Sequence, residues 1–289
     1  MLGKLMKYEW KSIYKVSAAI LIAMLAMTIL GSIMLRFPAV CALLEGKSTI
    51  PKDQQIFYLM ACVLGLLLYM FLLIGAAYGI VIYLGVRFYN TMYGSQGYLT
   101  HTLPVTGNQI FLSKVLVSGG AYLVVEVAIF VSLAVLFFSM LAGIGQVEGY
   151  TVEEMLREMY GAFFDAMEVL VINRKGYLVF LIIVTLVTPF TSMIILFGSI
   201  TLGQLSKKRK ALMGVVIYFG VLILNMVITA VIQTVQTLKA SLEVMNGTPD
   251  AAVLNMGISY KISLALALLG AAAMYASSYY ILNRKKNLD

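Results

Sequence analysis

Six long stretches of this chain carry almost no charged side chains. Five are uncharged, at residues 16–35, 54–86, 176–206, 211–238 and 262–283, and the sixth, 115–147, contains only Glu126. The hydrocarbon core of a bilayer is about 30 Å thick, which a helix of roughly 20 apolar residues crosses. Backbone groups in lipid must be satisfied within helices or closed barrels, and continuous rather than alternating hydrophobicity favours helices. The sequence therefore predicts an all-α membrane protein with six transmembrane helices.

We expect one transmembrane domain over residues 1–289, because 61% of the residues are hydrophobic and no polar stretch is long enough for a separate soluble domain. A lysine-rich head, residues 1–15, precedes the first span, and no small-residue cleavage site follows, so we expect this span to be retained. The predicted spans cover about 16–35, 57–86, 115–143, 177–203, 211–238 and 262–283.

The distribution of basic residues predicts the orientation. With the N-terminus in the cytoplasm, thirteen of the 21 Lys and Arg residues lie on the cytoplasmic side, among them the loop 206–210 (SKKRK). Arg36, Arg174 and Lys175 are exceptions. Basic residues near span ends favour the cytoplasmic side, so we expect both termini to lie in the cytoplasm. We expect the protein to reside in the plasma membrane. The net charge of +8 follows from this bias and does not indicate nucleic-acid binding.

The head, residues 1–15, has the pattern of an amphipathic interfacial helix. Its lysines share one narrow stripe at about 100° per residue: Lys4, Lys7, Lys11 and Lys15. The opposite face is apolar, with Leu2, Leu5, Met6, Trp10 and Ile13. This pattern suits a helix that lies on a membrane containing anionic lipid. Glu9 falls among the apolar residues, and two interpretations stay open: it tilts toward the lipid headgroups, or it meets a partner at the membrane surface.

The chain lacks the motifs of an enzyme. His101 is the single histidine, which excludes a two-histidine metal site. It lies in the predicted cytoplasmic loop, too far from the membrane centre to activate the serine of a membrane protease. The string GKST at 46–49 resembles part of a phosphate loop, but Cys41 stands where that motif needs its first glycine, and no strand precedes it. We therefore expect no catalytic residue, no metal and no cofactor in this chain.

The loop from Arg87 to Lys114, between the second and third spans, carries no charge inside its two basic ends and is rich in aromatic and apolar residues. An apolar patch on a cytoplasmic loop usually marks a protein contact. Gly94 and Gly97 favour termination of the second helix near these positions. Thr106 with Gln109 fits a capping box at the start of the third helix.

The segment YLTHTLPVTGNQIFLSK in this loop resembles the corresponding loop of permease subunits of ABC transporters of the type-2 exporter class. The motif stands here as Leu103-Pro104-Val105-Thr106, followed by Ser113 and Lys114. The resemblance implies a bacterial half-transporter that pairs with a second permease, as a homodimer or with a paralogue. It also implies separate cytoplasmic ABC ATPase subunits, which use ATP and Mg²⁺.

The same resemblance makes the loop a cytoplasmic coupling element between the second and third helices. The expected ATPase-contact residues are Glu9, Tyr98, Leu99, Thr100, His101, Thr102, Leu103 and Pro104. The alternative is that the segment from Tyr98 to Pro104 is a buried connector without a partner.

The spans contain few polar residues, which suits a hydrophobic or amphipathic cargo. A polar stripe on the fifth span comprises Asn225, Thr229, Gln233 and Gln236. The resemblance places that span along the translocation path, whereas the alternative is that these residues bind neighbouring helices. Glu126 is expected near mid-membrane, facing protein or a polar cavity, because a lipid-exposed carboxylate is costly. Some members of the family, including those that export phenol-soluble modulins, carry amphipathic peptides, and a peptide is the favoured cargo.

Two other functions stay open from the sequence. An oligomeric channel or membrane sensor subunit would use the same spans without ATP. A secondary transporter is less favoured, because we find no inverted repeat and only one charge within the spans. The segment from Lys239 to Lys261 fits either a re-entrant hairpin or an ordinary outer loop.

Overall fold

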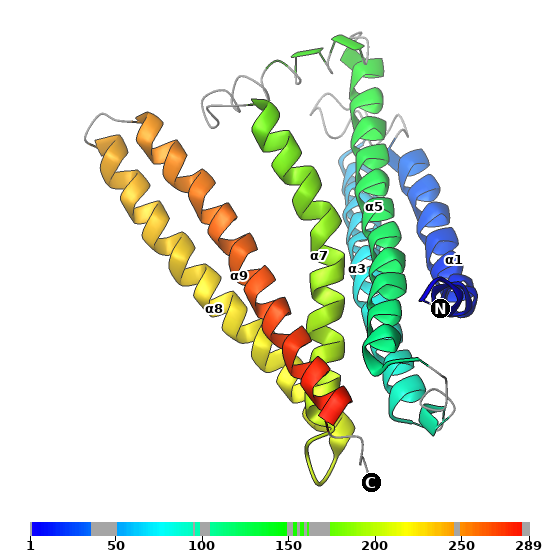
Figure 1. The fold of residues 1–289 in the computed structure, drawn as a ribbon. Coiled ribbons are helices and arrows are strands. Elements are labelled where there is room, and N and C mark those ends of the chain that lie inside the picture. The colour runs from blue at the N-terminus through cyan, green and yellow to red at the C-terminus, as the bar shows by residue number, and fades with distance from the viewer. Residues whose placement is uncertain are drawn as a thin grey trace. The chain divides into compact units, whose positions relative to one another are not determined.

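The computed structural model describes residues 2–35, 51–94, 96–98, 105–148, 153–154, 157–158, 161, 174–245 and 249–284. Within these ranges the chain is helical and contains no β-strand (Figure 1). The six long helices are α1 (Leu2–Leu35), α3 (Lys52–Met92), α5 (Gly107–Glu148), α7 (Arg174–Gly203), α8 (Lys210–Met245) and α9 (Pro249–Arg284).

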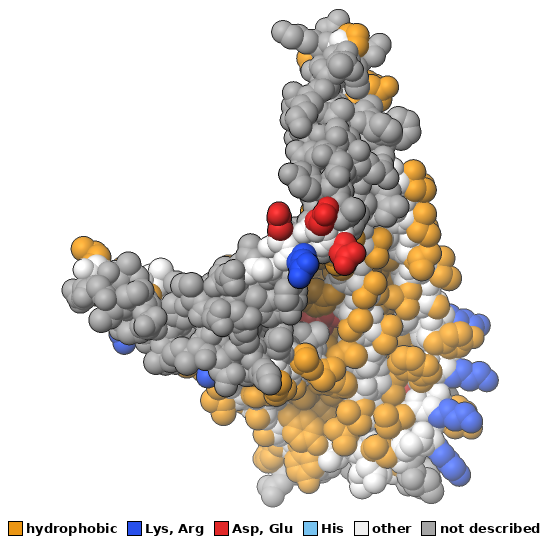
Figure 2. Space-filling view, turned by 90° about the horizontal axis from the view of Figure 1, so that it is seen from above, with side chains coloured by type: hydrophobic (Ala, Val, Ile, Leu, Met, Phe, Trp, Pro, Cys, Tyr) orange, Lys and Arg blue, Asp and Glu red, His pale blue; other side chains and the backbone are white. Residues whose placement is uncertain are grey.

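Within the described residues, each of the six helices contains a segment long and apolar enough to cross a membrane, which agrees with the six that the sequence predicted. The shortest such segments, Ile182–Gly203 and Lys261–Leu282, have 22 residues each. At 1.5 Å per residue they extend about 33 Å, close to the thickness of a hydrocarbon core. Hydrophobic side chains cover much of the described surface (Figure 2). Soluble proteins rarely expose apolar patches of this size, so the structure is compatible with a multi-pass membrane protein.

The chain divides into two compact units. The smaller unit comprises residues 13–81 and 124–164, and the larger comprises 1–12, 82–123 and 165–289. The boundary after Ser12 falls inside α1, which is one continuous helix from Leu2 to Leu35.

Three buried hydroxyl groups connect the helices of the smaller unit. Ser132 of α5 forms hydrogen bonds with Thr28 of α1 and with Tyr69 of α3. The Thr28 hydroxyl also lies 2.7 Å from the carbonyl oxygen of Met24. Hydroxyl hydrogen bonds of this kind hold helices together in an apolar environment, where an unpaired hydroxyl is costly.

In the larger unit, α7, α8 and α9 pack together around Ile195, Ala271 and Met274. The turn between α7 and α8 is tight. A Cβ atom on Gly203 would lie 2.4 Å from the backbone nitrogen of Gly214, so a side chain does not fit there. Arg209 adopts a left-handed φ of 53° in the same turn. The two helices therefore form a close hairpin whose tip is the basic loop 206–210.

The local signals around the loop between the second and third spans act as the sequence predicted. The helix α3 ends at Met92, and the backbone N–H of Gly94 donates to the carbonyl oxygen of Tyr89 at 3.0 Å. The capping box is confirmed: the N–H of Gln109 donates to the Thr106 hydroxyl, and the N–H of Thr106 donates to the Gln109 side-chain oxygen, both at 3.3 Å. These contacts define the start of α5.

The helices are longer than the predicted spans. The segment from Lys239 to Lys261, which the sequence left as a hairpin or a loop, is helical over 239–245 and 249–261, as extensions of α8 and α9. Pro189 lies inside α7 and is buried. Its ring removes one backbone hydrogen bond, and α7 changes direction part-way along its length in Figure 1.

Candidate functional site

A charged cluster, which we call the Glu9 cluster, joins the head to the ends of two helices in the larger unit. It comprises Glu9 of α1, Arg87 and Thr91 of α3, and Lys114 of α5. The Lys114 Nζ donates to Glu9 Oε1 at 2.5 Å and to the Thr91 hydroxyl at 2.8 Å. The Arg87 guanidinium donates to Glu9 Oε2 at 3.0 Å. Both carboxylate oxygens of Glu9 are thus engaged by cations of the same chain.

The Glu9 cluster is largely shielded from solvent. The Lys114 side chain is 5% exposed, and those of Glu9 and Arg87 are 19% exposed. A cavity of about 10 Å³ lies among these residues, with Phe88, Ser118 and Phe197 in its wall. This volume holds about one water molecule, so the cluster is a structural contact and not a metabolite pocket.

The charge of Glu9 results from two opposed effects. Glu9 belongs to the head, ahead of the uncharged stretch 16–35. Burial acts to raise the pKa of its carboxyl group, while the charges and hydrogen bonds of Lys114 and Arg87 act to lower it. The net result is a pKa below the ordinary value, so Glu9 is ionised at neutral pH.

Aromatic packing surrounds the cluster. The ring of Phe88 stacks on that of Phe197, with centroids 4.1 Å apart and planes 5° from parallel. The Phe88 ring also meets Phe111 edge to face, with centroids 6.0 Å apart. The hydroxyl of Tyr275 donates to the Asn108 side-chain oxygen at 2.6 Å. Helices α3, α5, α7 and α9 therefore share one packed layer next to the charged residues.

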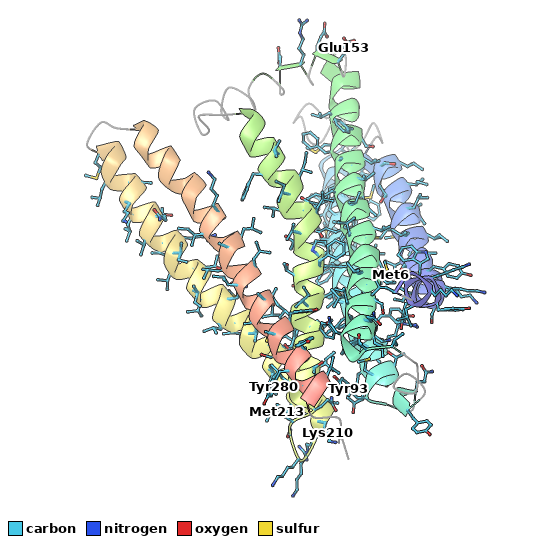
Figure 3. All side chains as sticks on the ribbon, in the orientation of Figure 1. Met6, Tyr93, Glu153, Lys210, Met213 and Tyr280 are labelled. Carbon is cyan, nitrogen blue, oxygen red and sulfur yellow. The ribbon has the colours of Figure 1, made fainter. Side chains whose placement is uncertain are left out.

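Tyr93, just beyond the end of α3, is tied to α7. Its hydroxyl donates to the Thr201 hydroxyl at 3.0 Å. Burial raises the pKa of Tyr93 to about 12, against the opposing effect of the hydrogen bond to Thr201. Figure 3 places Tyr93, Met213 and Tyr280 at the same end of the larger unit. Tyr93 thus ties the end of α3 to the part of α7 near its C-terminal end.

The expected ATPase-contact residues are only partly described. Tyr98 is 79% exposed, which is high for a large aromatic side chain. The other residues of that set in the loop lie outside the described residues: Leu99, Thr100, His101, Thr102, Leu103 and Pro104. Glu9, the remaining member, contacts Arg87 and Lys114 of its own chain.

The polar stripe of α8 is divided between two faces. Asn225, Thr229 and Gln236 are partly buried, whereas Gln233 is exposed. The Thr229 hydroxyl donates to the Asn225 side-chain oxygen at 3.5 Å, and the side-chain oxygen of Gln236 is buried without a hydrogen-bond partner among the described residues.

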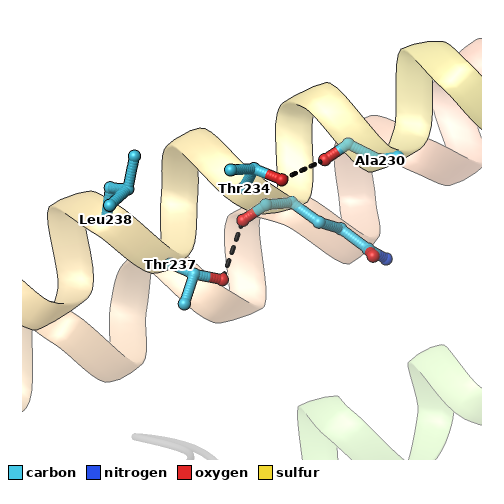
Figure 4. A pocket seen from close by; sticks show the side chains of 5 residues that line it. Ala230, Thr234, Thr237 and Leu238 are labelled. Atoms are coloured by element: carbon cyan, nitrogen blue, oxygen red, sulfur yellow. Dashed lines mark hydrogen bonds between the residues drawn. The ribbon is translucent and has the colours of Figure 1, made fainter.

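An open depression lies on the exposed side of α8. Its volume is about 400 Å³, and Ala230, Gln233, Thr234, Thr237 and Leu238 line it (Figure 4). The hydroxyls of Thr234 and Thr237 donate to the carbonyl oxygens of Ala230 and Gln233, both at 2.8 Å. The amide of Gln233 is therefore the main polar group that this depression presents to a ligand or to another chain.

Glu126 lies in the part of α5 that belongs to the smaller unit. Its side chain is partly buried, and its Oε2 atom is buried with no hydrogen-bond partner among the described residues. An unsatisfied buried polar atom in an apolar environment is costly, so we expect the Glu126 carboxyl group to have a hydrogen-bond partner.

Sequence reasoning missed the internal role of Arg87 and Lys114, which it treated as charges that bound a cytoplasmic loop. One signal was present: Glu9 is the single acidic residue of the head and lies on its apolar face. A carboxylate in that position needs a cation from another segment. The sequence did not say which of the 21 basic residues supplies it.

No family model, curated protein or solved structure matches this chain.

Proposed function

We propose that this chain is the membrane permease subunit of an ATP-driven exporter of the type-2 ABC class. The observation that carries the proposal is the motif between the second and third spans, from Leu103-Pro104-Val105-Thr106 to Ser113-Lys114. The hydrophobic helices provide the membrane part. ATP and Mg²⁺ would bind a separate cytoplasmic ATPase, since no nucleotide-binding motif was found in this sequence.

The contacts of the Glu9 cluster support a mechanical role for this region. Lys114, the last residue of the motif, binds Glu9 of the head and Thr91 of α3. A displacement of the loop would therefore reach α3, α5 and the head together, because all three are joined through one residue. The exposed ring of Tyr98 supplies an apolar group next to the proposed ATPase contact.

We propose an amphipathic peptide as the cargo and a second copy of the chain, or a paralogue, as the other half of the transporter. The support is the sparse polarity of the spans and the depression on α8, where Gln233 lies among apolar side chains and hydroxyls that are already hydrogen-bonded. An amphipathic ligand needs a mainly apolar site with few hydrogen-bonding groups. The orientation, with both termini in the cytoplasm, follows from the basic residues at the span ends.

An oligomeric channel or sensor subunit is the second candidate. One observation favours it: α8 exposes a short polar group of side chains, Gln233, Thr234 and Thr237, within its long apolar segment. Several copies that turned this side inward would surround a polar pore. This candidate needs no ATPase, and that difference separates it from the exporter.

Co-purification tests the proposal. The chain is expressed with an ABC ATPase from the same genome, and complex formation and ATP-dependent export are measured. Leu99→Asp and Leu103→Asp should release the ATPase or uncouple export, because each would bury an unpaired charge at the contact. Leu99→Met and Leu103→Met are the matched controls and should retain both activities. Normal complex formation and export with both leucines charged would refute the coupling assignment.

A further inference from the structure

The head presents two different faces within the larger unit. Leu2, Leu5, Met6 and Glu9 are partly buried, and Glu9 is bound to Arg87 and Lys114. The other side of the head is exposed, and we call it the basic face: Lys4, Lys7 and Lys11, with Tyr8 and Trp10 exposed at its flanks. The three lysines are spaced by three and four residues, so they share one side of the helix.

The sequence assigned the apolar face of the head to the membrane, whereas in the structure Leu2, Leu5 and Met6 of that face are partly buried. Glu9 lies on that apolar face, and its ion pairs hold the face against α3 and α5. Side chains that are partly covered by protein offer less surface for insertion into lipid. The basic face is therefore the side of the head that is open to another partner.

The charge of the basic face is not compensated from within the head. Glu9 is the only acidic residue among residues 1–15, and both of its carboxylate oxygens are bound to cations elsewhere. Lys4, Lys7 and Lys11 thus present three positive charges with no carboxylate beside them on the head. Figure 2 shows basic side chains among hydrophobic ones along one edge of the described surface.

Two exposed aromatic residues indicate which partner suits this face. Tyr8 is 73% exposed and Trp10 is 45% exposed. Tyr and Trp rings prefer the headgroup level of a bilayer, and clustered lysines beside a spanning helix attract anionic lipids. The head leads along the same helix into the uncharged stretch 16–35, so its distance from the bilayer is short.

We propose that the basic face binds the anionic headgroups of the adjoining leaflet, with Glu9 as the residue that orients it. Phosphatidylglycerol represents the chemical class of the ligand. Lipid binding by the basic face depends neither on the cargo nor on an ATPase. It adds a specific lipid contact to the function proposed above.

Trp10 is the single tryptophan of the chain, so its fluorescence reports on the head alone. The full chain is reconstituted into phosphatidylcholine vesicles that contain the same minority fraction of either brominated phosphatidylglycerol or brominated phosphatidylcholine. Bromine quenches tryptophan at short range. We expect stronger quenching by the brominated phosphatidylglycerol, and we expect this preference to fall at high salt, which screens surface charges.

The triple variant Lys4→Gln, Lys7→Gln, Lys11→Gln should lose the preference, since each lysine contributes about fivefold in affinity for an anionic surface. Two variants serve as controls. Replacing the same three lysines by Arg keeps the charge and should keep the preference. Lys239→Gln with Lys261→Gln removes exposed charge at other helices and should leave the quenching unchanged.

Equal quenching by the two brominated lipids in the wild type would overturn the proposal. A preference that persists in the triple Gln variant would also overturn it. If instead neither lipid quenches Trp10 and the ATPase protects it from a water-soluble quencher, the basic face binds protein and the lipid assignment is wrong. None of these outcomes depends on export, so the proposed exporter function is tested separately.

Discussion

Lys114 Nζ donates a hydrogen bond to Glu9 Oε1 at 2.5 Å, across 105 positions of sequence. This contact assigns the head to the larger unit, although the rest of α1 belongs to the smaller one. Arg87 binds the second oxygen of the same carboxylate, which brings the end of α3 into the contact. One carboxylate therefore connects three segments that are distant in sequence.

Glu9→Gln should destabilise the protein by roughly 3 kcal/mol, because it leaves two shielded cations without a counter-charge. This loss of stability is at the low end of the range for breaking a buried ion pair, because the Glu9 side chain is 19% exposed. Unfolding in mixed detergent micelles measures the change. Lys7→Gln, on the exposed side of the same head, is the matched control and should alter the stability by less than about 0.5 kcal/mol.

A double variant distinguishes loss of the ion pair from general damage to the head. Adding Lys114→Met to Glu9→Gln removes one uncompensated charge and should recover part of the lost stability. If Glu9→Gln were as stable as the wild type, the contact would contribute nothing to folding.

Thr106→Ala should lower the stability of the start of α5 by about 1 kcal/mol, because it removes the capping acceptor of Gln109. Hydrogen exchange of the amides of Gln109 and Ile110 measures the local effect. Thr106→Ser keeps the hydroxyl and should exchange like the wild type. Thr234→Ala, in the exposed middle of α8, is the control for loss of a threonine. Unchanged exchange in Thr106→Ala would mean that the cap does not stabilise this helix end.

The spans and the helix ends were predictable because their causes are local. Uncharged stretches identify the helices, since lipid excludes charge, and Thr106 with Gln109 identifies the start of α5 through contacts three residues apart. The extensions of α8 and α9 beyond the spans were missed, because the segment from Lys239 to Lys261 is only moderately polar and gives no strong signal for either a helix or a loop.

The tertiary contacts were not predictable from one sequence. The apolar face of the head looked suited to lipid, and only its contact with α3 and α5 reveals that Glu9 belongs there. The stripe on α8 seemed to form one face because its members are three or four residues apart, but the packing of the larger unit covers Gln236 and exposes Gln233. Burial depends on neighbouring helices, which local spacing does not identify.

Glu126→Gln should be milder than Glu126→Leu if the buried carboxyl group forms a hydrogen bond with another copy of the chain. Gln keeps an oxygen at the position that has no partner among the described residues, whereas Leu removes it. In the Leu variant, the hydrogen-bonding group of the other copy is left unpaired, which costs about 1–3 kcal/mol. The fraction of dimer in detergent and the export rate measure the difference. Equal and negligible effects of the two substitutions would show that the carboxyl group has no such partner.

Cysteine labelling in intact cells checks the orientation. In a background of Cys41→Ser and Cys62→Ala, Glu153→Cys should react with a membrane-impermeant maleimide, while Ser206→Cys should react only after permeabilisation. The reason is the density of basic residues beside Ser206, at 207–210, which favours the cytoplasmic side. Labelling of the Ser206→Cys variant in sealed cells would reverse the proposed topology.

The two glutamines of α8 should differ in their effect on transport. Gln233 is exposed in the depression beside Thr237, so Gln233→Leu should weaken export of an amphipathic peptide about fivefold, the value of roughly one hydrogen bond, without lowering stability. Gln236→Leu removes a buried oxygen that has no partner among the described residues, so it should leave stability unchanged or raise it, with export intact. Val235→Leu, exposed on the same helix, is the control. Vesicle export assays and unfolding in detergent measure both quantities. Loss of export in Gln236→Leu with normal export in Gln233→Leu would place the path on the covered side of α8.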